Sequence, residues 1–145
     1  MSQYAASVPA DGSVSPAIQK FFESFYRTSD TGEAHEAYAE HFTKDGTLVM
    51  IADEVKGHSA IVQKRHAMWA SVSSRSHKPT RIFAFGPGSE DVMLYGTVDY
   101  SLKDGKKASG VEWAARAHFV EQNGELKMDF YQVYLDSASM AAKAK

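Results

Sequence analysis

The 145-residue chain contains no cysteine, which excludes disulfides, zinc–thiolate sites and thiol nucleophiles together. No apolar run approaches the roughly 18 residues that a membrane span needs. The first residues have neither a basic segment nor an apolar one, so they do not predict a secretory signal. We therefore expect a cytoplasmic protein that has no membrane partner.

Strong charge of either sign is also missing, since the formal net charge at pH 7 is -2 and no basic run is present. Phosphate contacts need clustered Lys and Arg, so we expect no nucleic-acid partner. The length predicts one domain, which we place at residues 15–136. A flexible arm, residues 1–14, is expected before it and a C-terminal tail, residues 137–145, after it.

Helical spacing dominates the first half of the domain. Ser15 and Pro16 form a typical helix start, and the apolar stripe that follows ends near Asp30. A short second helix is expected over 33–41 and a strand over 47–51. After Gly57, a third helix places four side chains along one line: Ile61, Arg65, Met68 and Val72.

The second half favours strands over 80–85, 91–102, 108–121 and 126–135. Asp104-Gly105 and Asn123-Gly124 separate the last three strands, and both dipeptides are strong signals for two-residue hairpin turns. The order predicts an α+β domain, in which three N-terminal helices pack on one face of a curved, mostly antiparallel sheet.

Two-residue turns also fix a register. Counting back from them pairs Leu94 with Ala115 and Ala115 with Gln132, and it places Trp113 between Gly96 and Tyr134. This face is otherwise apolar, so Gln132 is predicted to point under the helices. Two interpretations remain open: a core amide bonded to backbone or water, or one wall of a ligand pocket.

The opposite face then has a charged end and an apolar end. We interpret Asp91, His118 and Asp129 as a solvated charge ladder and expect no metal. The remainder of this outer face predicts a homodimer interface, formed by Tyr95, Arg116, Tyr131, Val133 and Leu135.

Several segments carry a resemblance to a known family: FFESFYRTSD, LVMIADEVKGHSAI, RSHKPTRIFAF and the final YQVYLD. With them, most of residues 16–136 resembles the NTF2-like superfamily, in its SnoaL-like and scytalone-dehydratase-like branch, among small fungal members of unassigned role. The resemblance implies a cone-shaped α+β fold. It does not imply one activity, because this fold includes isomerases, dehydratases, cyclases and non-catalytic binding domains.

Carried over residue by residue, the resemblance assigns His77 the place of a catalytic histidine of scytalone dehydratase. The second histidine of that enzyme falls at Gly110 or Glu112. The aspartate base of ketosteroid isomerases falls in the strand 48–50, which has no acid. The resemblance therefore implies that neither family's complete catalytic set is reproduced.

The sequence supports two hypotheses. The first is a cofactor-independent cyclase, dehydratase or isomerase for a small apolar, oxygenated substrate, in which His77 and His66 move the proton. Arg65 would hold either an anionic ligand group or a helix-end carboxylate such as Asp136. The remaining candidates would line the pocket or bond a substrate oxygen: Tyr26, Trp69, Trp113, Gln132 and Tyr134. The second hypothesis is a non-catalytic ligand-binding or dimerisation module.

Overall fold

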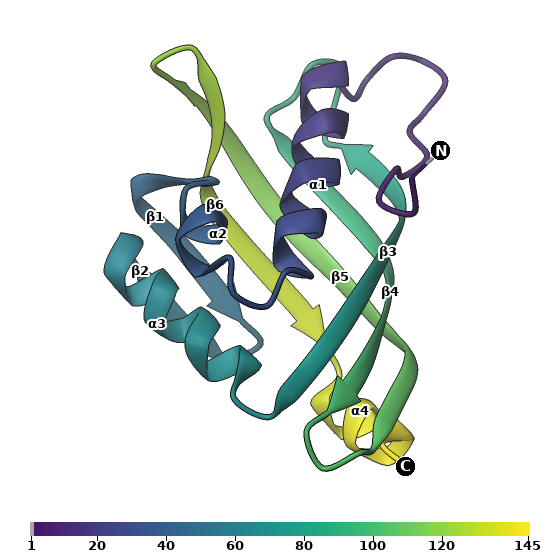
Figure 1. Cartoon of the computed structure of the whole chain (residues 1–145). Helices are drawn as coiled ribbons and strands as arrows, with labels where there is room; N and C mark the ends of the chain where they lie inside the picture. Colours follow the sequence, from purple (N-terminus) through teal and green to yellow (C-terminus); the bar gives the residue numbers. More distant parts are fainter. Residues whose placement is uncertain (1) are drawn as a thin grey trace.

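The computed structural model describes residues 2–145 and contains four helices and one six-stranded sheet (Figure 1). The helices are α1 (Pro16–Ser29), α2 (His35–Ala39), α3 (His58–Trp69) and α4 (Ser137–Lys143). The strands are β1 (Phe42–Met50), β2 (Asp53–Lys56), β3 (Val72–Ala84), β4 (Asp91–Leu102), β5 (Lys107–Gln122) and β6 (Glu125–Leu135). Their order is β2-β1-β6-β5-β4-β3, and only β1 and β6 pair in parallel.

The α+β class and the mostly antiparallel sheet are confirmed, although the structure has four helices where three were expected. The fourth helix, α4, lies in the predicted tail. Strand β2 was not among the predicted strands, and it forms because its residues pair with the end of β1 from Thr47 to Met50. Within residues 2–145, no helix has the length and apolar character that crossing a membrane requires.

Helix α1 begins and ends at the predicted residues. The Ser15 side chain accepts a hydrogen bond from the Ile18 amide, Pro16 follows in the first turn, and Asp30 is the C-cap. The buried side of α1 includes Phe22, Phe25 and Tyr26, each at most 1% exposed. These rings make α1 the main cover of the sheet.

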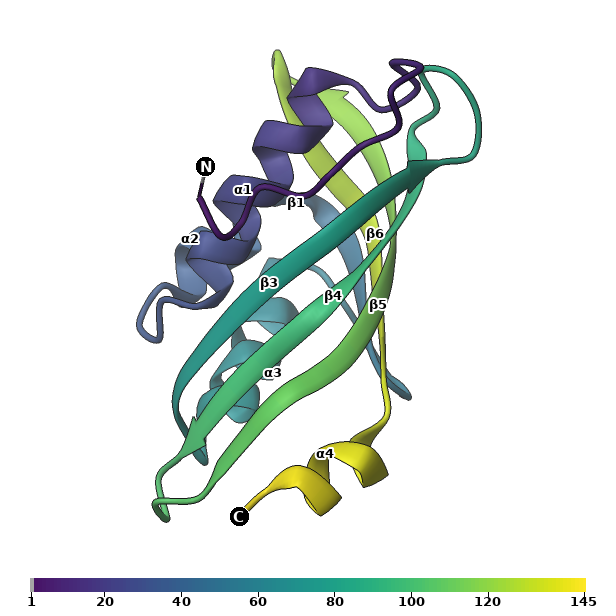
Figure 2. The same cartoon turned by 90° about the vertical axis from the view of Figure 1, so that its right-hand side faces the viewer.

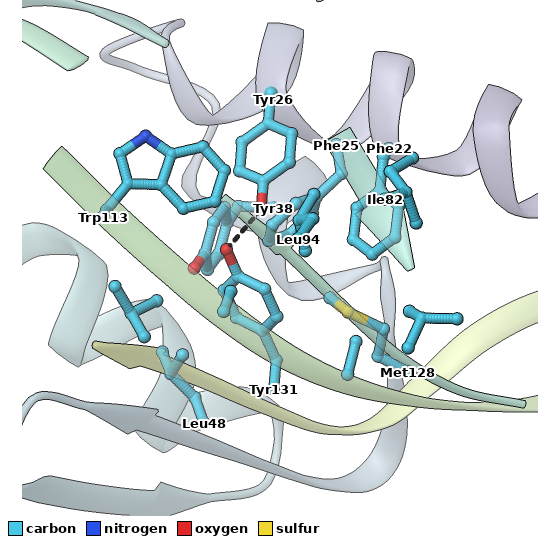
Figure 3. Packing of buried hydrophobic residues seen from close by; sticks show 14 of the residues in the cluster. Phe22, Phe25, Tyr26, Tyr38, Leu48, Ile82, Leu94, Trp113, Met128 and Tyr131 are labelled. Carbon is cyan, nitrogen blue, oxygen red and sulfur yellow. Dashed lines mark hydrogen bonds between the residues drawn. The ribbon is translucent and has the colours of Figure 1, made fainter. Parts of the chain in front are cut away.

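Helices α1, α2 and α3 lie on one side of the sheet, which curls toward them (Figure 2). The core fills the space between, with Leu94, Ala115 and Ala117 of the sheet fully covered. Figure 3 shows how Tyr26 on α1 and Tyr131 on β6 meet across this core. One end of the cone lies beside α4 and is where the pocket described below is found.

The predicted β4–β5 register is confirmed from Asp91 to Val98, but it shifts by one residue next to the turn, where Tyr100 pairs with Ala108. The β5–β6 register is correct only near the turn. Phe119 pairs with Met128, and then His118 pairs with Phe130, so Asp129 is an extra residue on β6. Such a bulge exchanges the two faces of everything beyond it. Gln132 therefore lies opposite Arg116 on the outer face, and its predicted position under the helices is wrong.

The same bulge corrects the predicted interface. Tyr131 and Val133 point into the core and are 2% and 9% exposed. Leu135 lies at the rim of the inner face, where it lines the pocket. Of the five predicted interface residues, Tyr95 and Arg116 remain on the outer face and exposed.

The first 14 residues make specific contacts with β3 from residue 2 onward. The Ser7 amide donates to the Thr80 carbonyl, and the Ile82 amide donates to the Ser7 carbonyl. Closer to the chain start, the Gln3 side chain donates to Ser76 Oγ and to the His77 carbonyl. The arm therefore runs beside the residues of β3 that lead to the pocket.

Candidate functional site

A pocket of about 200 Å³ opens between the inner face of the sheet and the helices. It is lined by side chains of α1, α2, α3, α4 and five strands. Its polar members come mainly from α1, α3 and β3: Tyr26, Ser29, Arg65, Arg75 and His77. Its apolar members include Met50, Val98, Trp113, Val133, Leu135 and Met140. A mostly apolar cavity with a few converging polar groups is typical of a small-molecule site.

The central feature of the pocket is a histidine–aspartate pair. His77 Nδ1 lies 2.5 Å from Asp30 Oδ1, and the His77 backbone amide donates to Asp30 Oδ2 at 2.8 Å. Asp30 stands at the end of α1, and its side chain is 7% exposed. Because a carboxylate accepts, Nδ1 carries the hydrogen, and Nε2 is left without a partner within residues 2–145.

Aromatic rings hold the His77 imidazole in place. Its ring centroid lies 5.2 Å from that of Tyr26 and 5.7 Å from that of Trp113. A third donor fixes the carboxylate, because the Tyr4 hydroxyl donates to Asp30 Oδ2 at 2.8 Å. Burial and the adjacent Asp30 raise the pKa of Tyr4 to about 12, so this hydroxyl keeps its proton.

Two buried tyrosines form a second polar group in the pocket. The hydroxyls of Tyr26 and Tyr131 lie 2.7 Å apart, as the dashed line in Figure 3 shows. Burial raises the pKa of both well above the ordinary value. Only one of these hydroxyls can donate to the other, so the second proton is available to an acceptor in the pocket.

Arg65 is 1% exposed and bonded to the backbone that follows α1. Its guanidinium donates to the carbonyl oxygens of Thr28, Thr31 and Ala34. Burial lowers its pKa to about 10. The alternative contact with Asp136 is wrong, since that carboxylate caps α4 by accepting from the amides of Ala138 and Ser139.

Arg75 is the other guanidinium in the pocket wall. Its Nη2 donates to the Met68 carbonyl at 2.7 Å, and its planar group lies 4.3 Å from the Trp69 ring centroid. The Nε atom is buried and has no partner within residues 2–145. Burial lowers the pKa of Arg75, which indicates a charge held away from water.

The pocket brings together four of the eight predicted site residues: Tyr26, Arg65, His77 and Trp113. His66 is exposed on α3 and stacks on His35, with ring centroids 3.7 Å apart. Trp69 packs behind Arg75 and Arg65. The bulge at Asp129 turns Gln132 and Tyr134 to the outer face, away from the pocket.

Sequence reasoning did not select Asp30, Tyr131 or Arg75 as pocket residues. For Asp30, one feature of the sequence pointed to a specific role. A carboxylate at a helix C-terminus interacts unfavourably with the helix dipole, so its presence there indicates another contact that stabilises it. Tyr131 was assigned to the wrong face by the unrecognised bulge. Arg75 had a periodicity signal, because it lies two residues before His77 and on the same face of β3.

The outer face carries a second histidine–aspartate pair, with His118 Nδ1 and Asp129 Oδ1 2.6 Å apart. Glu90 lies 3.7 Å from the other ring nitrogen. Within residues 2–145, no group of three or more His, Asp or Glu side chains is arranged to hold a metal ion. His118 pairs with Asp91 as predicted, whereas Asp129 contacts it from the bulge and not from the predicted paired position.

No protein-family model matches this chain, and no curated protein matches it. Solved structures do match. ActVI-ORFA from Streptomyces coelicolor is 19% identical with a TM-score of 0.69, covering 83% of this chain and 96% of that one. A hypothetical protein with a ketosteroid isomerase-like fold from Catenulispora acidiphila is also 19% identical, with a TM-score of 0.67, covering 86% and 92%.

A hexachlorocyclohexane dehydrochlorinase, LinA type 2, is 14% identical with a TM-score of 0.68, and 83% of each chain is covered. At these identities the likeness shows the fold alone. It confirms the expected fold, with the helices packed on one side of a curved sheet.

Proposed function

We propose that this protein is a cofactor-independent lyase or isomerase, in which His77 transfers a proton to and from a small, largely apolar, oxygenated substrate. The observation that carries the proposal is the buried Asp30–His77 pair, whose free Nε2 belongs to a residue of the pocket wall. Asp30 holds the ring in one tautomer and stabilises the imidazolium that forms after proton uptake.

The chemistry that fits is removal of a proton next to a carbonyl group. The C–H bond breaks, the proton moves to His77 Nε2, and the electron pair shifts to the carbonyl oxygen as an enolate. Reprotonation at another carbon completes an isomerisation. Donation of the same proton to a leaving hydroxyl at the β-carbon completes a dehydration. The free hydroxyl proton of the Tyr26–Tyr131 pair is suited to stabilise the enolate oxygen.

The test is hydrogen–deuterium exchange at the α-carbons of 2-tetralone in D2O, a two-ring enolisable ketone, followed by NMR. We expect wild-type protein to accelerate exchange. His77→Gln should lower this rate about 10²- to 10⁴-fold, the usual contribution of a general base, and Asp30→Asn should also lower it.

The outer-face pair supplies a matched control. His118→Gln and Asp129→Asn remove a histidine–aspartate contact of nearly the same length outside the pocket, so the exchange rate should not change. Exchange that equals the rate in buffer, or that is the same in all four variants, would favour the second candidate function, a non-catalytic ligand-binding module.

We also propose that two copies associate through the outer sheet face, in a revised form of the predicted interface. Large apolar side chains are exposed there on β3, β4 and β6: Phe83, Met93, Tyr95 and Tyr134. The rings of Phe83 and Tyr95 stack at 6.2 Å. An apolar patch of this kind on a small domain favours association.

Light scattering coupled to size-exclusion chromatography tests this interface. Tyr95→Glu should convert a dimer to a monomer, because it buries a charge between the two sheets. Gln63→Glu is the control: Gln63 is exposed on α3, on the other side of the sheet, and its change adds the same charge but should leave the mass unaltered. A wild-type monomer at working concentration contradicts the proposal.

A further inference from the structure

The charged groups of the pocket wall do not balance. Among residues 2–145, two guanidinium groups line it, of Arg65 and Arg75, and no carboxylate does. The nearest acid is Asp30, which lies behind His77 and already accepts from three donors: Tyr4 Oη, the His77 amide and His77 Nδ1. With neutral His77, these groups together carry one excess positive charge.

The two arginines differ in how well they are satisfied. Arg65 donates to three carbonyl oxygens: that of Thr28 in the last turn of α1, and those of Thr31 and Ala34 in the segment before α2. Arg75 donates to a single carbonyl, that of Met68. Its Nε and Nη1 groups make no hydrogen bond within residues 2–145, and Nε is fully buried. A buried N–H group without an acceptor costs free energy until an acceptor arrives.

Aromatic rings surround Arg75, and a donor on one of them also lacks an acceptor. The indole nitrogen of Trp69 is buried and has no partner within residues 2–145. Trp69 and Tyr100 hold the guanidinium plane, at 4.3 and 5.6 Å from their ring centroids. Stacking of this kind fixes the direction of a guanidinium while leaving its edge free to bind an oxygen.

Arg75 also stands at a useful distance from the proposed base. Arg75 and His77 are alternate residues of β3 that pair with Tyr100 and Val98, and both line the pocket. Their Cα atoms are therefore about 6.6 Å apart along the strand. One ring of a substrate can span that interval, with an oxygen substituent at Arg75 and an acidic C–H at His77.

We propose that the substrate of this pocket carries an anionic oxygen, such as a carboxylate or an ionised phenol, and that Arg75 is the specificity-determining residue that binds it. The inference deepens the proposed function, because it concerns the same pocket and rests on that pocket being the substrate site. Arg65 keeps a structural role in the segment after α1. The anion neutralises Arg75 and supplies the acceptors that its free N–H groups lack.

The experiment compares two ligands of the same shape, 2-naphthoate and 2-naphthamide, by calorimetric titration at pH 7.5. Wild-type protein should bind the anion at least about 10-fold more tightly, since a hydrogen bond to a charged group contributes roughly 10- to 100-fold in affinity. Arg75→Met should bring the ratio close to one, mostly by weakening the binding of naphthoate. Arg75→Lys should retain part of the preference.

Arg81→Met is the matched control, because Arg81 is an exposed arginine of the same strand and lies on the outer face opposite Tyr95. It removes the same charge from the molecule and should leave the ratio unchanged. Absence of binding to wild type, equal affinity for both ligands, or equal loss of preference in both variants overturns the inference. If Arg75→Met does not fold, the wild-type ratio and Arg75→Lys decide.

His77→Gln separates this inference from the proposed function. The variant should lose exchange on 2-tetralone and keep the preference for naphthoate. If wild-type protein prefers naphthoate but shows no exchange that depends on His77, Arg75 is the anion contact of a non-catalytic binding protein. His77-dependent exchange without a preference leaves the enzyme proposal standing and removes the role of Arg75.

Discussion

Two histidine–aspartate pairs with nearly equal hydrogen bonds are found within residues 2–145, and they differ in burial. The side chains of His77 and Asp30 are 14% and 7% exposed, whereas those of His118 and Asp129 are 36% and 40% exposed. Solvent screens the outer pair, so its interaction is weak although its bond is short. The inner pair lies at the pocket and is partly buried, so solvent screens its interaction less.

Gly96 is a single position on which the shape of the site depends. A Cβ atom added there would lie 2.3 Å from the Lys78 carbonyl oxygen and 2.8 Å from the Pro79 Cα, so the β3 backbone would have to move. We expect Gly96→Ala to lower the free energy of unfolding by about 1–3 kcal/mol, as overpacking usually does. Urea unfolding measures this.

Because Lys78 follows His77, the same substitution should also lower the exchange rate on 2-tetralone. Gly86→Ala is the control, since no atom lies within 4 Å of the added Cβ. Its unfolding free energy should stay within about 0.5 kcal/mol of the wild type. Equal stability of the two variants would show that the contact at Gly96 relaxes without cost.

At the scale of elements, local signals predicted the helices and turns, and a non-local contact decided the register. Ser15-Pro16, Asp104-Gly105 and Asn123-Gly124 each act within a few residues, and all lie where the sequence places them. The bulge at Asp129 depends on how β6 pairs with both β5 and β1, and the sequence of β6 alone does not determine this pairing. One extra residue was therefore enough to place Gln132 and Tyr131 each on the face opposite to the predicted one.

The N-terminal arm gives a second prediction at this scale. Tyr4 reaches Asp30 from outside α1, so we expect it to be a positioning residue that acts through that carboxylate. Tyr4→Phe removes one donor from Asp30 and keeps the ring beside Arg27. With fewer donors, Asp30 is held less firmly, and so is the His77 ring that it orients. The exchange rate on 2-tetralone should therefore fall, by less than in Asp30→Asn.

Urea unfolding of Tyr4→Phe separates positioning from a loss of stability: a positioning role lowers the exchange rate in protein that is still fully folded. The control is Tyr134→Phe, which removes a hydroxyl from the exposed outer face and should leave the exchange rate unchanged. An unchanged rate in Tyr4→Phe would mean that the arm supports the fold and not the proton transfer.

At the scale of the whole molecule, the fold could be predicted and the site only in part. The fold class follows from the alternation and spacing of apolar residues and from the turn residues, and each of these features can be recognised within one segment of the sequence. The pocket depends on the meeting of segments far apart in the chain, such as Asp30 with His77 and Tyr26 with Tyr131. The residues next to one member of such a pair in the sequence give no information about where the other member lies. His77 was therefore predicted and Asp30 was not.

The pH dependence of stability is also a whole-molecule property, since it sums groups of opposite sign. Burial between Phe21 and Phe25 lowers the pKa of His41, so the unfolded chain binds this proton more readily. That contribution to stability is present above pH 6.5 and is lost as the pH falls below it. The hydrogen bond to Asp129 raises the pKa of His118. Its contribution is therefore present below 6.5 and is lost as the pH rises through the raised value.

Acidification from pH 8 to pH 5.5 should thus destabilise the protein through His41 and stabilise it through His118. We expect His41→Gln to lose less stability over this interval than the wild type and His118→Gln to lose more, as measured by urea unfolding at each pH. The urea dependence of the unfolding free energy should stay constant, so that midpoints report stability alone. Changes of the same sign in both variants would contradict the assignment, because it requires opposite proton linkage at these two histidines.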